Sequence, residues 1–162
     1  MLALKIQSTK NFMNQLLTGE LFDSFLLEEA TISGAIDYSL DGHIHPEFYG
    51  EEPISYDFLP WTEAKSVCYQ LIKGKRTPLY FKFVLQLKPE AMNKLLEQNS
   101  LLEASENLKA MVLSIRFDER GTILTTGTSY HNFSLDKSPD KLWDQALLRF
   151  LNGKEVDYEE LT

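Results

Sequence analysis

Two histidines separated by one residue, His43 and His45, have the spacing most typical of a metal site in this sequence. In an extended segment both imidazole rings point to the same side of the chain, as coordination of one ion requires. Glu47 or Asp41 would supply an oxygen ligand. His43 and His45 are therefore a candidate metal site, and the sequence identifies no particular cofactor.

A basic cluster comprises Lys73, Lys75 and Arg76, and Thr77 follows it directly. One interpretation is structural, because cations at the end of a helix complement its macrodipole and its free carbonyl groups. The alternative is an anion site or partner-binding surface, in which Arg76 donates two hydrogen bonds to a carboxylate or phosphate and Thr77 adds a hydroxyl group. A P-loop is excluded because its upstream glycine is missing.

Hydroxyl groups are concentrated in the run Thr125–Ser129, which contains Gly127. A β-bulge or a close backbone approach would explain that glycine. Ser129 and Ser134 flank His131, but neither serine stands in the GxSxG context of a nucleophile elbow. We therefore assign no catalytic residue, and the sequence favours a protein that is not an enzyme.

Aromatic residues cluster in and after an acidic loop. The members of this cluster are Phe48, Tyr49, Tyr56, Phe58 and Trp61. They either cap the core or, if exposed, form an apolar and negatively charged surface suited to a protein partner, in which aromatic anchors dominate the binding energy.

The charges are unevenly distributed along the chain. Residues 11–63 contain 11 Asp and Glu but no Lys or Arg, whereas residues 64–89 contain 6 Lys and Arg but no Asp or Glu. In one interpretation the two segments lie side by side and partly neutralise each other. In the other, a basic patch stays exposed and attracts an anionic ligand or an acidic partner.

The periodicity of apolar residues predicts the elements that must position these groups. Strands are expected at 2–6, 22–32, 36–40, 79–88, 111–117 and 122–130. Helices are expected between Thr9 and Gly19, Pro60 and Gly74, Pro89 and Leu96, and Pro139 and Gly153. Gly19 is predicted to end its helix in the left-handed conformation, and Asp41-Gly42 to form a tight hairpin turn. The acidic tail, residues 154–162, is expected to fray.

These elements predict one α+β domain over residues 1–162, with an antiparallel, twisted sheet and about four helices. Strand, helix, hairpin and helix follow one another over residues 2–73 and again over 78–152, which is compatible with duplication of one unit. The unit resembles the one duplicated in DNA sliding-clamp domains. However, the first and third helices carry few Lys or Arg residues, so nucleic-acid binding is not favoured.

Four segments resemble an uncharacterised family from Gram-positive anaerobic bacteria with a domain-of-unknown-function label. They are FDSFLL at 22–27, IKGKRTPLYFKFV at 72–84, TTGTS at 125–129 and LDKSPDKLWD at 135–144. The resemblance spans nearly the whole chain. It implies a bacterial, intracellular, single-domain protein and transfers no activity, cofactor or catalytic residue.

The composition excludes several classes of protein. Apolar residues at 43% and charged residues at 25% are ordinary for globular domains, so disordered and collagen-like classes do not fit. The single cysteine, Cys68, cannot form an internal disulfide and is expected to be buried. With no apolar run long enough for a membrane span and no secretory signal, a cytoplasmic location is expected.

Three functions remain open at this point. The first is a non-catalytic binding or interaction protein that contacts a protein partner or a second copy of itself through residues 47–61 and 73–77. The second is a metal-dependent enzyme that uses His43 and His45. The third is a clamp-like protein associated with nucleic acid, which the net charge of −8 makes the least favoured.

Overall fold

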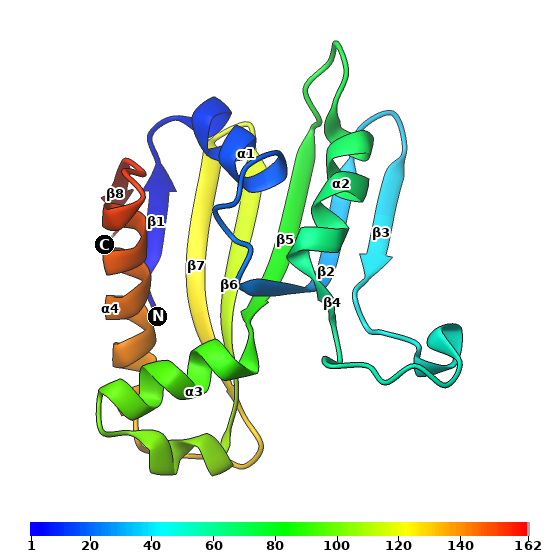
Figure 1. Ribbon diagram of the computed structural model, residues 1–162. Helices are drawn as coiled ribbons and strands as arrows, with labels where there is room; N and C mark the ends of the chain where they lie inside the picture. Colours follow the sequence, from blue (N-terminus) through cyan, green and yellow to red (C-terminus); the bar gives the residue numbers. More distant parts are fainter. Residues whose placement is uncertain (162) are drawn as a thin grey trace.

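Seven strands lie side by side in one antiparallel sheet, in the order β3-β2-β5-β6-β7-β1-β8, and a short eighth strand, β4, pairs with β2 (Figure 1). This computed structural model describes residues 1–161. The strands are β1 (Ala3–Ile6), β2 (Phe25–Ser33), β3 (Asp37–Asp41), β4 (Leu59–Pro60), β5 (Tyr80–Leu87), β6 (Leu108–Asp118), β7 (Gly121–Tyr130) and β8 (Tyr158–Glu160). The predicted α+β fold with an antiparallel sheet is confirmed.

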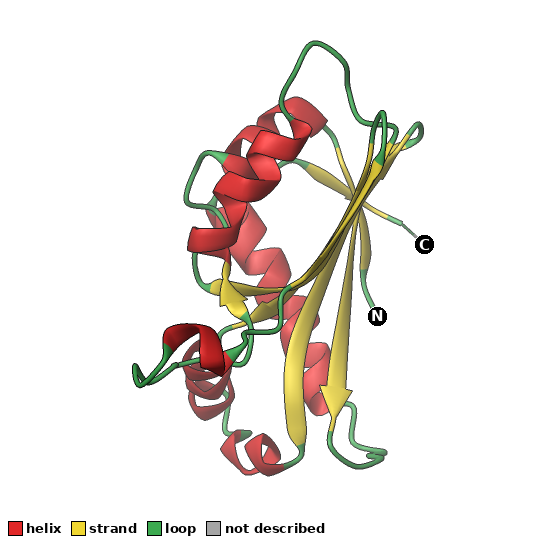
Figure 2. Cartoon of the chain, turned by 90° about the vertical axis from the view of Figure 1, so that its right-hand side faces the viewer, coloured by secondary structure: helices red, strands yellow, loops and turns green. Residues whose placement is uncertain are grey.

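The helices cover one face of this sheet and leave the other open (Figure 2). They are α1 (Thr9–Leu17), α2 (Trp61–Ile72), α3 (Pro89–Gln98) and α4 (Ser138–Gly153), with short 3-10 turns at Pro46–Tyr49 and Leu102–Glu106. The alternation in β5 explains this arrangement, because Phe81, Phe83 and Leu85 are buried under the helices while Lys82 and Gln86 face the open side. Within residues 1–161, no helix has both the length and the apolar character needed to cross a membrane.

Helix α1 begins and ends as its sequence requires, except at Gly19. The Ser8 side chain accepts a hydrogen bond from the backbone N–H of Asn11 and caps the helix. The prediction that Gly19 adopts a left-handed conformation is wrong, since its φ is not positive. Glycine fits there because a Cβ atom would lie 2.9 Å from the carbonyl oxygen of Gln15.

The predicted hairpin turn at Asp41-Gly42 is also wrong. Strands β2 and β3 are joined at Gly34, whose N–H donates to the Ile36 carbonyl at 3.0 Å. At Gly42 the chain instead leaves β3 and passes so close to β2 that a Cβ atom would lie 1.8 Å from the Leu27 carbonyl oxygen. Gly42 is therefore required by a close backbone approach between distant segments, which local turn statistics do not reveal.

The prediction that the tail at residues 154–162 frays is wrong for residues 158–160, and residue 162 lies outside the described part of the chain. Residues 158–160 form β8, which pairs with β1 in the register Leu4↔Glu160 to Ile6↔Tyr158. Backbone hydrogen bonds make this pairing possible for an acidic sequence, because they do not depend on the side chains. Neither a β-bulge nor a close backbone approach accounts for Gly127, because the shift in the β6–β7 ladder lies between Leu108 and Ala110 and a Cβ atom at Gly127 would meet nothing within 4 Å.

The two units of strand, helix, hairpin and helix do not occupy equivalent places in the sheet. In the second unit, β5 pairs directly with its own hairpin β6–β7. In the first unit, β1 is separated from the β2–β3 hairpin by all three strands of the second unit. The order of elements thus recurs along the chain, while the strand pairing does not.

Helix α2 is fixed to α1 and to the sheet by two side chains. The fully buried Trp61 donates its indole N–H to the Leu16 carbonyl at 3.0 Å and packs edge-on against Phe83. One turn further on, Lys65 donates to the Gly19 carbonyl at 2.7 Å and to the Asp23 carboxylate at 2.8 Å. Both contacts lie in the first two turns of α2, so they fix its N-terminal half.

Replacing Trp61 with alanine tests this arrangement. We expect Trp61→Ala to lower the free energy of unfolding by about 3–5 kcal/mol, because it leaves a cavity beneath three elements. Urea unfolding followed by circular dichroism measures the change. The control is Phe133→Ala, which truncates a side chain that is 87% exposed and should change stability by less than about 0.5 kcal/mol. Equal effects of the two substitutions would contradict the central role of Trp61.

Candidate functional site

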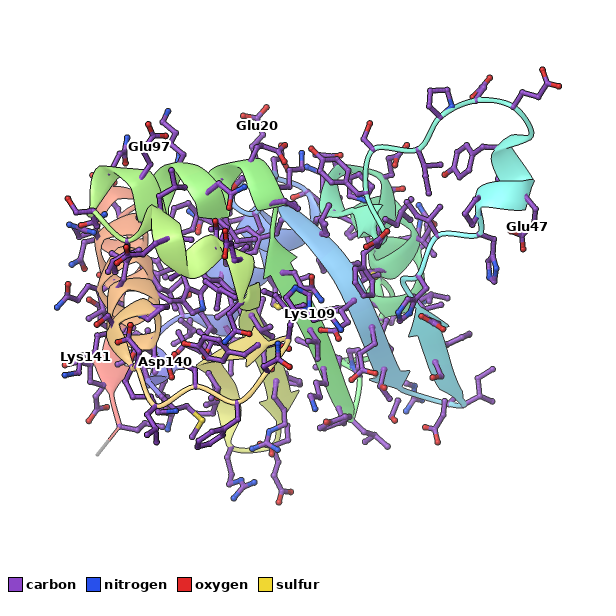
Figure 3. The ribbon with its side chains drawn as sticks, turned by 90° about the horizontal axis from the view of Figure 1, so that it is seen from below. Glu20, Glu47, Glu97, Lys109, Asp140 and Lys141 are labelled. Carbon is purple, nitrogen blue, oxygen red and sulfur yellow. The ribbon has the colours of Figure 1, made fainter. Side chains whose placement is uncertain are left out.

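A long excursion between β3 and β4, residues 42–58, stands off from the sheet edge and is called the strap here (Figure 3). Its base is closed by backbone hydrogen bonds from Ile44 to Asp57 at 2.8 Å and from Leu59 to Gly42 at 2.9 Å. His43 and Phe58 face each other across this base, with ring centroids 4.4 Å apart. The strap is therefore an ordered, closed loop, and the part that projects contains Glu47.

A pocket of about 580 Å³ lies between the strap and α2. This strap pocket has a mainly apolar lining, which includes Leu27, Leu40, Phe48, Leu59, Ala64 and Val67. Val67 on α2 is 50% exposed and Phe48 on the strap is 84% exposed, so apolar surface is available on both sides. Its volume falls in the range of about 300–1,000 Å³ that is usual for ligand sites.

Both predicted metal-binding histidines line this pocket, but each faces a carboxylate of its own segment. His43 Nδ1 lies 2.6 Å from Asp41 Oδ1, and His45 Nδ1 lies 3.5 Å from Glu47 Oε1. The pKa of Asp41 is lowered because its carboxylate accepts hydrogen bonds from the backbone N–H and the ring of His43. Residues 1–161 contain no group of three or more His, Cys, Asp or Glu side chains placed to hold a metal ion.

The five aromatic residues of the predicted cluster do not form one exposed surface. Phe48 is exposed, Tyr49, Tyr56 and Phe58 are half-buried, and Trp61 belongs to the core. Tyr56 attaches the base of the strap to α3, because its hydroxyl group donates to the Glu90 carboxylate while the Lys88 Nζ lies 5.6 Å from its ring centroid. Only the outer part of the strap is thus available as a surface.

Two adjacent residues of α2, Val67 and Cys68, differ in their exposure. Cys68 is fully buried, as expected, and burial raises the pKa of its thiol to about 12. Val67, which shares the apolar helical spacing of the core residues, instead faces the strap pocket. The signal that could have distinguished them was the position of the strap, which the sequence pattern does not give.

The basic cluster lies at the opposite end of α2 from the strap (Figure 1). Residues 73–78, called the basic loop here, begin at the C-cap residue Lys73, and the last turn of α2 contains no basic residue. Lys75 and Arg76 lie beyond the helix and are exposed, and neither forms an ion pair within the described part of the chain. Complementing the macrodipole accounts for Lys73 but not for Lys75 and Arg76.

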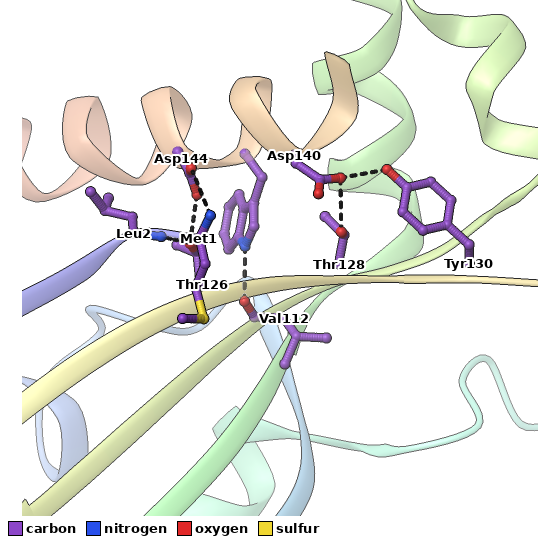
Figure 4. A network of polar contacts seen from close by, with 9 residues as sticks. Met1, Leu2, Val112, Thr126, Thr128, Tyr130, Asp140 and Asp144 are labelled. Atoms are coloured by element: carbon purple, nitrogen blue, oxygen red, sulfur yellow. Dashed lines mark hydrogen bonds and ion pairs between the residues drawn. The ribbon is translucent and has the colours of Figure 1, made fainter. Parts of the chain in front are cut away.

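The hydroxyl-rich run attaches the sheet to α4 (Figure 4). Thr126 donates to the Asp144 carboxylate at 2.5 Å and accepts from the Leu2 N–H at 2.8 Å. Thr128 and Tyr130 both donate to Asp140, at 2.9 and 2.5 Å. Burial, together with the Asp140 hydrogen bond, raises the pKa of Tyr130 to about 12. These hydroxyl groups are therefore engaged in a structural network.

The structure defines an α+β protein with one open antiparallel sheet. Residues 15–159 match a family described as "Family of unknown function (DUF5721)", and the chain belongs to that family. The resemblance to a family of unknown function is thereby confirmed. No curated protein and no solved structure matches the chain.

Tyr130 gives the fold a dependence on alkaline pH. Because its pKa rises from 10.0 to about 12 in the folded state, the neutral phenol contributes stability below pH 10 that is lost as the pH rises toward 12. We expect Asp140→Asn to lower the pKa of Tyr130 while burial still holds it above its ordinary value. Nuclear magnetic resonance of ¹³C-labelled tyrosine measures this titration, and an unchanged pKa in the variant would contradict the role of Asp140.

Proposed function

We propose that the protein is a non-catalytic binding protein that captures a basic segment of a partner protein in the strap pocket. The observation that carries the proposal is an apolar pocket of about 580 Å³ beneath a strap rich in carboxylates. An apolar side chain of the partner fills the pocket, while neighbouring Lys or Arg residues face the strap.

The charge of the strap supports a basic partner. Glu47, Glu51, Glu52 and Asp57 are exposed, and the strap contains no Lys or Arg. One described ion pair joins the acidic residues 11–63 to the basic residues 64–89. It forms between Asp23 and Lys65 and lies away from the strap. Complementary charge increases the rate of association and selects among partners, whereas the apolar anchor supplies most of the affinity.

The polar groups of the pocket favour binding over catalysis. Asp41 and His43 bond to each other, and His45 faces Glu47, so these side chains are paired within one segment. Cys68 lies behind the pocket wall, and burial keeps its thiol protonated at neutral pH. The pocket therefore presents an apolar surface with an acidic border, which suits recognition of a basic and apolar segment.

Selection of peptides from a random phage-displayed library tests the proposal. We expect the enriched peptides to contain a large apolar residue flanked by Lys or Arg, because both features are needed to match the pocket and the strap. Fluorescence anisotropy should then show that Val67→Glu weakens binding of these peptides by about tenfold or more, since it places a charge in the apolar wall.

Leu79→Glu is the matched control. This side chain is 74% exposed and lies outside the strap pocket, so the substitution adds the same charge without altering the pocket. The control should leave the affinity unchanged. Peptides that bind Val67→Glu as tightly as the parent protein, or that carry no basic residues, would contradict the proposal.

A further inference from the structure

A second cavity, of about 480 Å³, lies where the N-terminal turn of α1 meets the basic loop. Four cationic side chains line it: Lys10 from α1, and Lys73, Lys75 and Arg76 from the basic loop. Among its described lining residues there is no Asp or Glu. Tertiary packing thus adds Lys10 to the cluster that the sequence places at residues 73–77, and the name basic groove is used for this cavity.

The inner wall of the basic groove is apolar. Phe81 and Phe117, from neighbouring strands, stack with their centroids 4.9 Å apart and their planes at 14°. Met13 of α1 and Ile72 of α2 extend this surface toward the helices. Phe81 is only 2% exposed, so the half-buried Phe117, Met13 and Ile72 supply the accessible floor. The groove therefore has exposed cations above an apolar floor, which is the arrangement needed for an anion attached to an apolar body.

The first turn of α1 has no negative charge of its own. The first turns of α2, α3 and α4 contain Glu63, Glu90 and Asp140, each of which complements the positive end of its helix. The first turn of α1 has no acidic residue and instead contains Lys10. Glu155 and Asp157 line another cavity, with Ser8 and Asn11, and are not part of the groove lining. A bound anion would supply a negative charge on the groove side of α1.

Nearby acidic groups do not neutralise the groove. Lys10, Lys73, Lys75 and Arg76 form no ion pair within residues 1–161. Asp118 lies in the adjacent β6–β7 turn, but its carboxylate bonds to Arg120 at 3.1 Å. Glu119, also in that turn, lines a neighbouring cavity together with Thr77 and Pro78 and is not part of the groove lining.

We infer that the basic groove binds a small organic phosphate, with the phosphate held by Arg76 and the lysines and its apolar body on Phe117 and Met13. A guanidinium group donates two parallel hydrogen bonds to phosphate oxygens, and Thr77 adds a hydroxyl donor. This site is distinct from the strap pocket and lies at the other end of α2. It does not depend on the proposed capture of a basic partner.

Calorimetric titration of the full chain with phenyl phosphate, inorganic phosphate and benzyl alcohol tests this inference. We expect one phenyl phosphate to bind per chain, at least about tenfold more tightly than inorganic phosphate, because only the former reaches the apolar floor. Benzyl alcohol should not bind measurably. The affinity for phenyl phosphate should fall as salt is added, since exposed cations are screened.

Charge variants locate the site. The double variant Lys75→Ala/Arg76→Ala should weaken phenyl phosphate binding by about tenfold or more. Lys137→Ala/Lys154→Ala removes the same charge from exposed positions outside the groove and should leave binding unchanged. Lys10→Gln tests the groove from α1 and should also weaken binding, whatever the effect of the double variant on the fold of the loop.

Two results would overturn the inference. Equal affinity for phenyl phosphate and inorganic phosphate would show that the apolar floor takes no part. Equal losses in the two double variants would show that only the net charge matters. Val67→Glu separates this site from the strap pocket, because it should weaken peptide capture while leaving phenyl phosphate binding intact.

Discussion

Helices pack against only one face of the sheet, and the rest of the structure follows from that constraint. The large apolar side chains of the central strands point to one side, and all four helices cover that side, while Val84 and Val112 lie on the open face. Trp61 shows how tightly this cover is joined, since one indole contacts α1 and β5 from α2. The helices nevertheless end before the sheet does. The strap pocket and the basic groove both occur where this cover stops, at the two ends of α2.

Helix α2 converts the change of charge sign along the sequence into a separation in space. The acidic strap precedes its first residue, and the basic loop follows its last. A helix of 12 residues is about 18 Å long, roughly twice the Debye length at physiological salt. The two projecting segments therefore do not neutralise each other. The contact between Lys65 and Asp23 is the described exception, and it serves to fix the helix.

Local patterns predicted the elements whose side chains alternate between core and solvent, such as β5 and the β6–β7 hairpin, because that period of two follows directly from strand geometry. They failed where distant segments meet. Asp41-Gly42 has the sequence of a tight turn, and the contact of Gly42 with the Leu27 carbonyl cannot be read from the neighbouring residues because it is not local. Strand β8 was missed because its pairing depends on the backbone. Each candidate site likewise contains residues that local patterns do not predict. Val67 joins the strap, and Lys10 joins the basic loop, only through tertiary packing.

The position of β1 dictates the order in which the chain can fold during synthesis. Leu2 bonds to Thr126, which lies 124 positions further along the chain, and the other side of β1 waits for β8. At about 5–20 residues per second, a ribosome leaves β1 without partners for many seconds. Strands β2, β5 and β6 can pair in the meantime, because each is followed soon by its neighbour in the sheet. Strand β1 is thus incorporated later than β2, β5 and β6, and such long-range closure makes folding slow.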